Sequence, residues 1–152
     1  MLTETTTMSV LEESLKPMLG VWKCDNSRTE NFEEFLAAMG VNFIGRKMAK
    51  RASPTLSLAI EGANFVDRTQ TPFNTKVTSV PLDGTVVDVV QYAGATSKSH
   101  FEYKDGKAII VNLPSDPKIK KTVLSRHIVN GELVQILDVG DGEVVCKRVF
   151  VR

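Results

Sequence analysis

Two arginines stand in segments whose alternating pattern places them among apolar side chains. Near the end of the chain, Arg148 lies two residues after Cys146 and two before Phe150. Because successive side chains of a β-strand point to opposite faces, these three residues share one face. Arg126 stands in the same relation to Leu124, two residues before it. If both faces look into one core, the sequence predicts two guanidinium groups in the interior.

A buried guanidinium needs a partner that neutralises it. An unpaired buried charge is strongly unfavourable even after relaxation, and arginine cannot lose its proton. A ligand carboxylate matches the guanidinium in a bidentate, charge-assisted pair. From the residues alone, two interpretations stay open. Either the arginines bind an anionic ligand, or they face solvent or pair with Asp88, Asp138 or another acid.

The other reactive side chains form no catalytic pattern. His100 and His127 are the two histidines, and neither has a nucleophile or a metal ligand at a recognisable spacing. Cys24 and Cys146 are too far apart for a disulfide framework, and we interpret them as buried thiols that behave as small apolar groups. The sequence therefore predicts no enzyme, no metal site and no cofactor.

Composition and charge favour a soluble globular domain. Hydrophobic residues make up 42% of the 152 residues, and charged residues make up 24%. The net charge of +1 argues against a broad nucleic-acid-binding surface. The beginning of the chain lacks the basic and apolar regions of a signal peptide, and no segment approaches the roughly 18 apolar residues of a membrane span. We therefore expect a cytoplasmic protein.

Residues 31–52 are the one strongly helical region. Asn31 and Glu34 suit an N-cap and its partner in the first turn, and Gly40 suits a helix end. The apolar face of the first half consists of Phe32, Phe35, Leu36 and Met39. The basic face of the second half consists of Arg46, Lys47, Lys50 and Arg51. The spacing predicts two short amphipathic helices joined by a tight turn.

From Thr55 onward the pattern changes to short strands separated by turn signals. The expected strands are 55–60, 65–69, 73–80, 86–92, 97–103, 108–113, 119–128, 133–139 and 144–151. Asn130-Gly131, between the expected strands 119–128 and 133–139, is a strong hairpin signal. With a further segment around Trp22 this makes about ten antiparallel strands, a pattern typical of an up-and-down barrel or a sandwich.

The pattern gives one folded domain and a short preceding segment. Residues 1–18 are expected to be an N-terminal extension that is partly disordered or forms a short helix. Ser9 suits the N-cap of such a helix, and Pro17 limits its length. Residues 19–152 form the predicted barrel domain.

Several blocks of the sequence resemble the intracellular fatty-acid-binding protein family. The blocks are Gly20-Val21-Trp22-Lys23, Glu30–Leu36, Met39–Ala49, Pro54-Thr55-Leu56 and Val144–Phe150. They follow the family order through most of the chain, so the chain is identified as a member of this family, which belongs to the calycin superfamily and has cellular retinoid-binding relatives. A longer turn at Gly140-Asp141-Gly142 and the N-terminal extension are similar to features of invertebrate members.

The resemblance implies a fold and a ligand. The implied fold is all-β: a ten-stranded antiparallel up-and-down barrel around a water-filled cavity, with the helix pair as a lid. The implied function is that of a monomeric intracellular carrier of a long-chain fatty acid or a similar amphiphilic carboxylate, which it delivers to membranes or the nucleus. A retinoid ligand, or a lipid-signalling interaction module with a vestigial cavity, is the alternative.

The resemblance also assigns site residues. Arg126 and Arg148 match the family arginines that bind the ligand carboxylate. Phe150 replaces the family tyrosine, and the loss of that hydroxyl hydrogen bond should weaken head-group binding by about 0.5–1.5 kcal/mol. The residues that match the ligand-tail and portal positions are Phe32, Phe35, Leu36, Val41 and Phe73.

The basic helix face is a second candidate site. Arg46, Lys47, Lys50 and Arg51 could meet an anionic membrane, where each surface cation adds about 1 kcal/mol of attraction. By resemblance, the same patch implies nuclear import. A plain solvated helix face is the alternative interpretation of these four residues.

Overall fold

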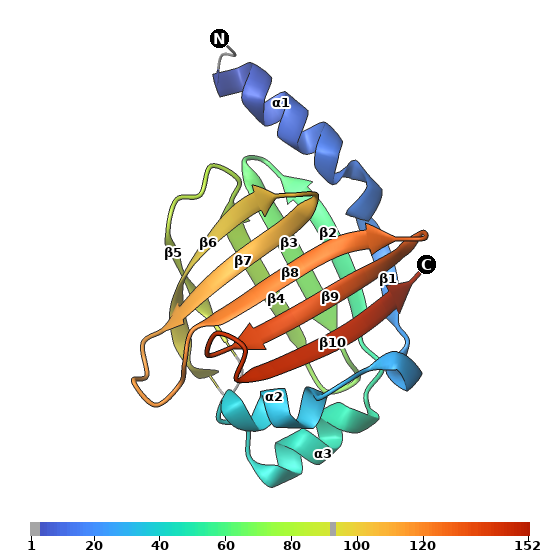
Figure 1. Ribbon diagram of the computed structural model, residues 1–152, viewed down its shortest axis with the longest axis vertical. Helices are drawn as coiled ribbons and strands as arrows, with labels where there is room; N and C mark the ends of the chain where they lie inside the picture. The colour runs from blue at the N-terminus through green and yellow to red at the C-terminus, as the bar shows by residue number, and fades with distance from the viewer. Residues whose placement is uncertain (1–3, 92–93) are drawn as a thin grey trace.

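The computed structural model describes residues 4–91 and 94–152, which form one antiparallel sheet with two helices at one end and one at the other (Figure 1). The strands are β1 (Gly20–Cys24), β2 (Thr55–Glu61), β3 (Asn64–Gln70), β4 (Thr75–Pro81), β5 (Val87–Val90), β6 (Thr96–Lys104), β7 (Lys107–Pro114), β8 (Thr122–Val129), β9 (Glu132–Val139) and β10 (Val144–Val151). The prediction of ten antiparallel strands is confirmed. The predicted fifth strand ended at Tyr92, which lies outside the described residues.

The sheet curls into a nearly closed barrel. Its strand order is β4-β3-β2-β1-β10-β9-β8-β7-β6-β5, so β4 and β5 are the two edges and the first and last strands meet in the middle. Tight turns join most neighbours. Asn130 and Gly131 both have positive φ, at 52° and 76°, which is the backbone of the hairpin that this pair predicts.

Two helices cover one end of the barrel, as predicted. They are α2 (Phe32–Ala38) and α3 (Phe43–Arg51), and a short 3-10 turn η2 (Asn26–Arg28) precedes them (Figure 1). Asn31 occupies the N-cap position of α2, as expected, but its side chain makes no capping hydrogen bond. Its backbone is left-handed and its side chain donates to the Val145 carbonyl at 3.0 Å, so it fastens the lid to β10 instead of capping α2.

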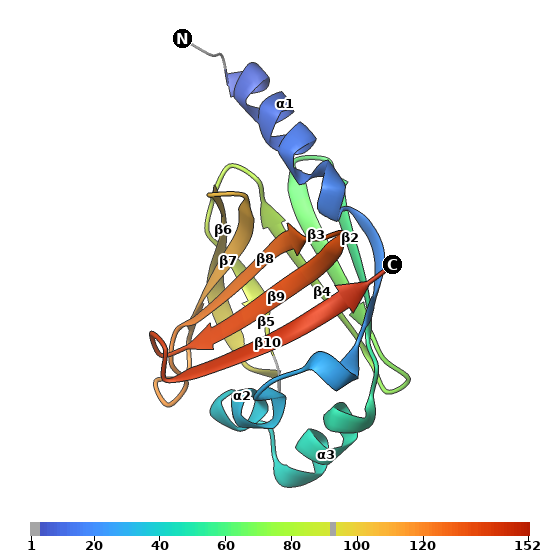
Figure 2. The same ribbon diagram turned by 45° about the vertical axis from the view of Figure 1, so that its right-hand side comes forward.

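Apolar side chains close the opposite end. Helix α1 (Glu4–Leu15) begins before Ser9, the expected N-cap, and leads through the turn η1 (Lys16–Met18) into β1; Figure 2 shows it projecting from the end opposite the lid. Leu15 and Met18 are buried against Trp22, whose Nε1 donates to the Met18 carbonyl at 2.9 Å. Among the described residues, no helix is long and apolar enough to cross a membrane.

Candidate functional site

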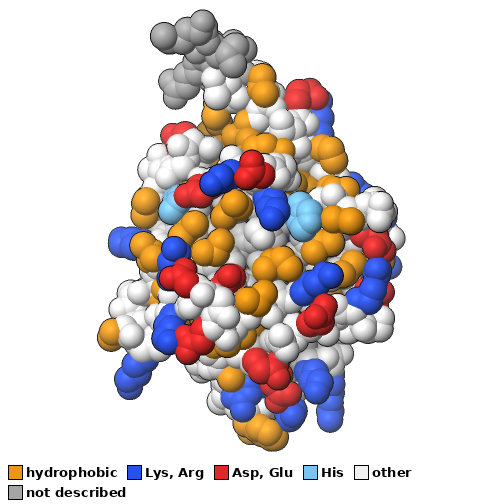
Figure 3. Space-filling model, in the orientation of Figure 1, with side chains coloured by type: hydrophobic (Ala, Val, Ile, Leu, Met, Phe, Trp, Pro, Cys, Tyr) orange, Lys and Arg blue, Asp and Glu red, His pale blue; other side chains and the backbone are white. Residues whose placement is uncertain are grey.

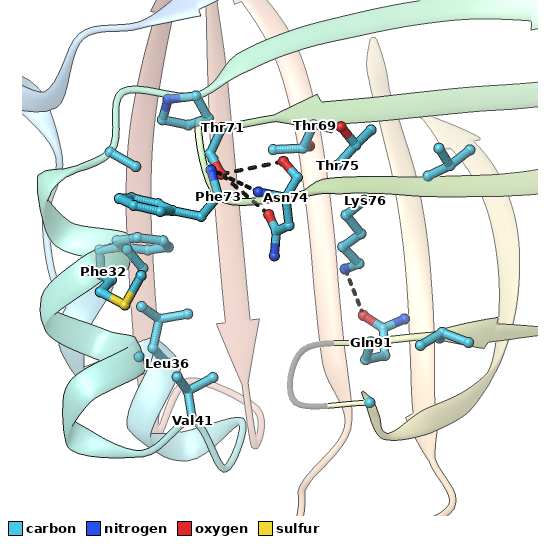
Figure 4. Close-up of a pocket in the computed structure, with 18 of the residues that line it drawn as sticks. Phe32, Leu36, Val41, Thr69, Thr71, Phe73, Asn74, Thr75, Lys76 and Gln91 are labelled. Atoms are coloured by element: carbon cyan, nitrogen blue, oxygen red, sulfur yellow. Dashed lines mark hydrogen bonds between the residues drawn. The ribbon is translucent and has the colours of Figure 1, made fainter.

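A large cavity lies beneath the lid. It has a volume of about 510 Å³ and is lined by Phe32 and Leu36 of α2, by Val41 between the helices, and by Phe73 of the β3–β4 turn (Figure 4). The Thr71 hydroxyl fixes this turn because it accepts the backbone N–H groups of Phe73 and Asn74. Four of the five residues expected at the ligand tail therefore lie around one cavity.

A smaller and more polar chamber lies deeper in the barrel. It has a volume of about 50 Å³, and Phe35, the fifth predicted tail residue, lines this chamber and not the larger cavity. Phe150 and Arg126 also line it. The residues that line both spaces are Pro54, Thr69, Lys76, Gln91 and Arg148. These shared residues mark where an apolar chamber under the lid passes into a polar one.

Arg148 lies at this passage and keeps an unused donor. Only 5% of the residue is exposed, and its guanidinium carbon lies 3.9 Å from the ring centroid of Phe32, close enough for a cation–π contact. One Nη2–H donates to Asn26 Oδ1 at 3.0 Å. The Nε–H has no acceptor among the residues that the structure describes. The guanidinium is thus held in place while it lacks an anionic partner.

Asn26 links Arg148 to the lid. Its Oδ1 accepts from Arg148 and from the Cys24 thiol at 3.3 Å, and its Nδ2 donates to the Ala52 carbonyl just after α3 at 2.9 Å. Through Asn26 and the ring of Phe32, both lid helices are tied to the same cation. No sequence pattern marks Asn26, because its role depends on a contact with Arg148 of β10, near the opposite end of the chain.

Arg126 is also inside the barrel, but it already has a carboxylate partner. Only 3% of the residue is exposed; its Nε donates to Gln135 Oε1 at 2.9 Å, and an Nη2–H donates to Asp67 Oδ2 of β3. Arg126 therefore pairs with an acid of the protein itself, which is one of the two interpretations that its sequence pattern left open. The acid is Asp67, whereas Asp88 pairs with Lys98 on the surface.

Alternation could have revealed Asp67 and the nearby Lys76. Asp67 lies two residues after the buried Phe65 on β3, and Lys76 lies four residues before the buried Val80 on β4. In an alternating strand each of these polar residues shares the inward face of its apolar neighbour. The alternation that places Arg126 of β8 and Arg148 of β10 in the interior therefore holds for these two strands as well.

The helical lid presents apolar and basic side chains together. Phe43 and Ile44 are 62% and 70% exposed, and blue and orange side chains gather at the lid end of Figure 3. The basic face is partly neutralised. Lys47 and Lys50 pair with Glu33 at 2.9 and 3.7 Å, and the hydrogen bond from Lys47 lowers the pKa of Glu33.

Neither histidine and neither cysteine forms a reactive pair. Cys24 and Cys146 are both buried free thiols, and burial raises the pKa of Cys146 to about 12, so this thiol is protonated at neutral pH. His100 contacts Glu102 on the surface at 2.9 Å, and burial lowers the pKa of His127. A neutral thiol without a neighbouring base is a poor nucleophile.

The fold and the site together define a class of protein. A barrel with a helical lid encloses an apolar chamber, and a buried cation with a spare donor lies at the inner end of that chamber. This arrangement is that of a small barrel protein that encloses an amphiphilic ligand.

The comparisons with known proteins give the family. The chain is 33% identical over 135 residues to sodium/calcium exchanger regulatory protein 1 of Doryteuthis pealeii, covering 89% of this chain and 96% of that protein. It is 31% identical over 134 residues to fatty acid-binding protein homolog 6 of Caenorhabditis elegans, with coverages of 88% and 96%. No family model matches.

A solved structure agrees with these sequence matches. Apo lipid binding protein 8 of Caenorhabditis elegans superposes with a TM-score of 0.84 at 25% identity, covering 91% of this chain and 96% of that chain. The chain belongs to the fatty-acid-binding protein family, as its sequence blocks indicated.

Proposed function

We propose that this protein carries a long-chain fatty acid, or a similar amphiphilic carboxylate, with the tail under the lid and the head group at Arg148. The observation that carries the proposal is the unused Nε–H of a buried guanidinium that lines the cavity. An ionised carboxylate is the ligand group that best satisfies such a donor. The similarity to fatty acid-binding protein homolog 6 of Caenorhabditis elegans supports a fatty acid as the ligand.

The cavity suits an alkyl chain. Its volume of about 510 Å³ is within the usual range of small-molecule sites, and Phe32, Leu36 and Val41 give it an apolar wall. Burial of a sixteen-carbon chain contributes roughly 12 kcal/mol gross at about 0.8 kcal/mol per methylene, and association costs offset much of this. The contact with the head group then sets the orientation of the ligand in the cavity. Phe150, in place of the family tyrosine, leaves this task to Arg148 and to the remaining donors of Arg126.

The protein is proposed to act as a non-catalytic, monomeric carrier in the cytoplasm. The described histidines and cysteines offer no base next to a nucleophile, which supports a carrier over an enzyme. The alternatives of a retinoid carrier or an interaction module are not favoured by the family relationships.

Native mass spectrometry of freshly purified protein tests this function. We expect a one-to-one complex with a species of fatty-acid mass, or its formation when oleate is added to delipidated protein. A chain that carries no lipid and takes up no oleate would contradict the proposal.

We propose further that the lid contacts anionic membranes during ligand transfer. Phe43 and Ile44 project from the lid, and the cations of Arg46 and Lys47 lie 5.8 and 5.1 Å from the Phe43 ring centroid. An apolar tip surrounded by cations is the pattern of an interfacial helix on anionic lipid. Nuclear import through Arg46, Lys47, Lys50 and Arg51 stays a prediction, and Glu33 offsets part of that charge.

Replacing Phe43 and Ile44 with serine is expected to slow transfer of a fluorescent fatty acid to anionic vesicles at least about threefold, because less apolar area enters the interface. Stopped-flow transfer to vesicles with and without phosphatidylserine measures this effect. The matched control is Val21→Ser, which removes a side chain that is 56% exposed on β1, away from the lid. Equal rates for the lid variant and the control would exclude docking through this tip.

A further inference from the structure

In the described part of the chain, three hydrogen bonds fasten the junction between α3 and β2 to the end of β1 and to η2. The backbone N–H of Cys24 donates to the Pro54 carbonyl at 3.1 Å, and the Ser53 hydroxyl donates to the Cys24 carbonyl at 3.0 Å. The third bond runs from Asn26 Nδ2 to the Ala52 carbonyl at 2.9 Å. Asn26 therefore helps to anchor the end of the lid.

The same side chain holds the guanidinium of Arg148. Asn26 Oδ1 accepts an Nη2–H of Arg148 at 3.0 Å, and the Cys24 thiol donates to this oxygen at 3.3 Å. The Asn26 amide cannot turn over without losing these bonds and the bond from its Nδ2 to Ala52. The lid junction thus fixes the amide, and the amide presents its oxygen to Arg148.

Asn26 orients the cation without neutralising it. A carboxamide oxygen is uncharged, so Arg148 keeps its full positive charge, and its Nε–H has no acceptor among the residues that the structure describes. The Phe32 ring lies over the guanidinium, 3.9 Å from its central carbon. The ring and the amide together hold the guanidinium in place. A group that is already held loses little further freedom when an anion binds to it.

We propose that Asn26 is a positioning residue that sets head-group specificity: it holds Arg148 ready for a carboxylate and leaves the positive charge for that carboxylate. The role rests on the proposed binding of the head group at Arg148. A neutral acceptor suits this role, because a carboxylate at position 26 would itself pair with the guanidinium, as Asp67 pairs with Arg126. The two buried arginines thus differ in function: one pairs within the protein, and the other is held for a ligand.

Replacing Asn26 with alanine tests the positioning role. Delipidated wild-type and variant proteins are titrated with oleate and with oleyl alcohol, which share a tail. We expect Asn26→Ala to bind oleate at least about threefold more weakly and the alcohol equally well, because the freed guanidinium must be ordered again by the carboxylate. Asn26 is exposed, so its replacement leaves the core intact. Equal losses for the two ligands would overturn the proposal. Tighter oleate binding would also overturn it, because Asn26 would then compete with the ligand.

Ser53→Ala is the matched control. It removes another of the three bonds that anchor the lid junction, and Ser53 is exposed and does not line the cavity. We expect this variant to keep the wild-type affinities for oleate and for oleyl alcohol. A loss of oleate preference as large as that of Asn26→Ala would assign the effect to a loosened lid and would overturn the proposal.

Asn26→Asp tests whether the acceptor must be neutral. Like Asn26→Ala, it cannot donate to the Ala52 carbonyl, but it adds a carboxylate next to Arg148. We expect oleate to bind at least about tenfold more weakly than to the wild type, while oleyl alcohol binds as it does to Asn26→Ala. Oleate affinity in Asn26→Asp at or above that of Asn26→Ala would overturn the proposal.

A double variant shows whether Asn26 acts through Arg148. In the Arg148→Met protein, a further Asn26→Ala change should leave oleate binding unaltered, since the cation that Asn26 holds is gone. A further loss equal to that in the wild-type background would overturn the proposal. Equal affinities of the wild type for oleate and oleyl alcohol would refute the head-group site together with this role. An oleate preference that Asn26→Ala leaves unchanged refutes the role of Asn26 alone.

Discussion

Replacing Arg126 with alanine is expected to lower the free energy of unfolding by about 3–5 kcal/mol, because removal of one partner leaves a buried charge uncompensated. Arg126 and Asp67 are both buried, and their side chains contact each other across the barrel. Chemical denaturation of delipidated protein, followed by the fluorescence of Trp22, measures the change.

The double variant Asp67→Asn with Arg126→Met is the control for this prediction. It removes both charges and should recover most of the lost stability, since replacement of a whole buried ion pair is often neutral. Arg68 is next to Asp67 on β3 and forms an exposed ion pair with Glu61 of β2. Arg68→Ala should therefore lower the free energy of unfolding far less than Arg126→Ala. The account of the buried pair fails if Arg126→Ala is no more damaging than Arg68→Ala.

The second large effect is expected at Arg148. Arg148→Met keeps an unbranched, flexible side chain at this position and removes the cation, so oleate should bind at least about tenfold more weakly. A hydrogen bond to a charged group contributes about 1.5–3 kcal/mol, and about 1.4 kcal/mol is tenfold in affinity. Displacement of a fluorescent fatty acid by oleate measures the loss.

Stability separates a binding defect from a folding defect in this variant. Arg148 has no carboxylate partner among the described residues, in contrast to Arg126, so Arg148→Met leaves no buried acid behind. We expect an unfolding free energy within about 1 kcal/mol of the wild type. Arg68→Met, on the outside of the barrel, should change neither property. Unchanged oleate affinity in Arg148→Met would show that Arg148 does not bind the ligand head group.

The two arginines differ in whether a carboxylate of the protein pairs with them, and the acid that pairs with Arg126 lies far away in the sequence. Alternation along β8 and β10 was sufficient to place Arg126 and Arg148 in the interior, since strand periodicity is a local property. Whether each cation has a partner depends on which strand lies across the barrel. Asp67 is 59 residues from Arg126, and although alternation places Asp67 on the inward face of β3, no local pattern shows that it lies across the barrel from Arg126.

The lid shows the same division between local and tertiary information. The apolar spacing in residues 31–52 was enough to predict two helices, and they form as α2 and α3. The i, i+4 spacing of Ile44 and Met48 also predicts an apolar face on the second helix, yet Ile44 is 70% exposed. Helical periodicity identifies the apolar face of a helix. Which residues of that face become buried depends on how α3 packs against the barrel.

In the proposed complex, Arg148 binds an ionised head group inside the barrel. Two titrations of delipidated protein, with oleate and with oleyl alcohol, isolate the contribution of the head group, because the two ligands share a tail and differ in charge. We predict that oleate binds at least about tenfold more tightly and that this difference is lost in Arg148→Met. Equal affinities for the acid and the alcohol in the wild-type protein would contradict the claim.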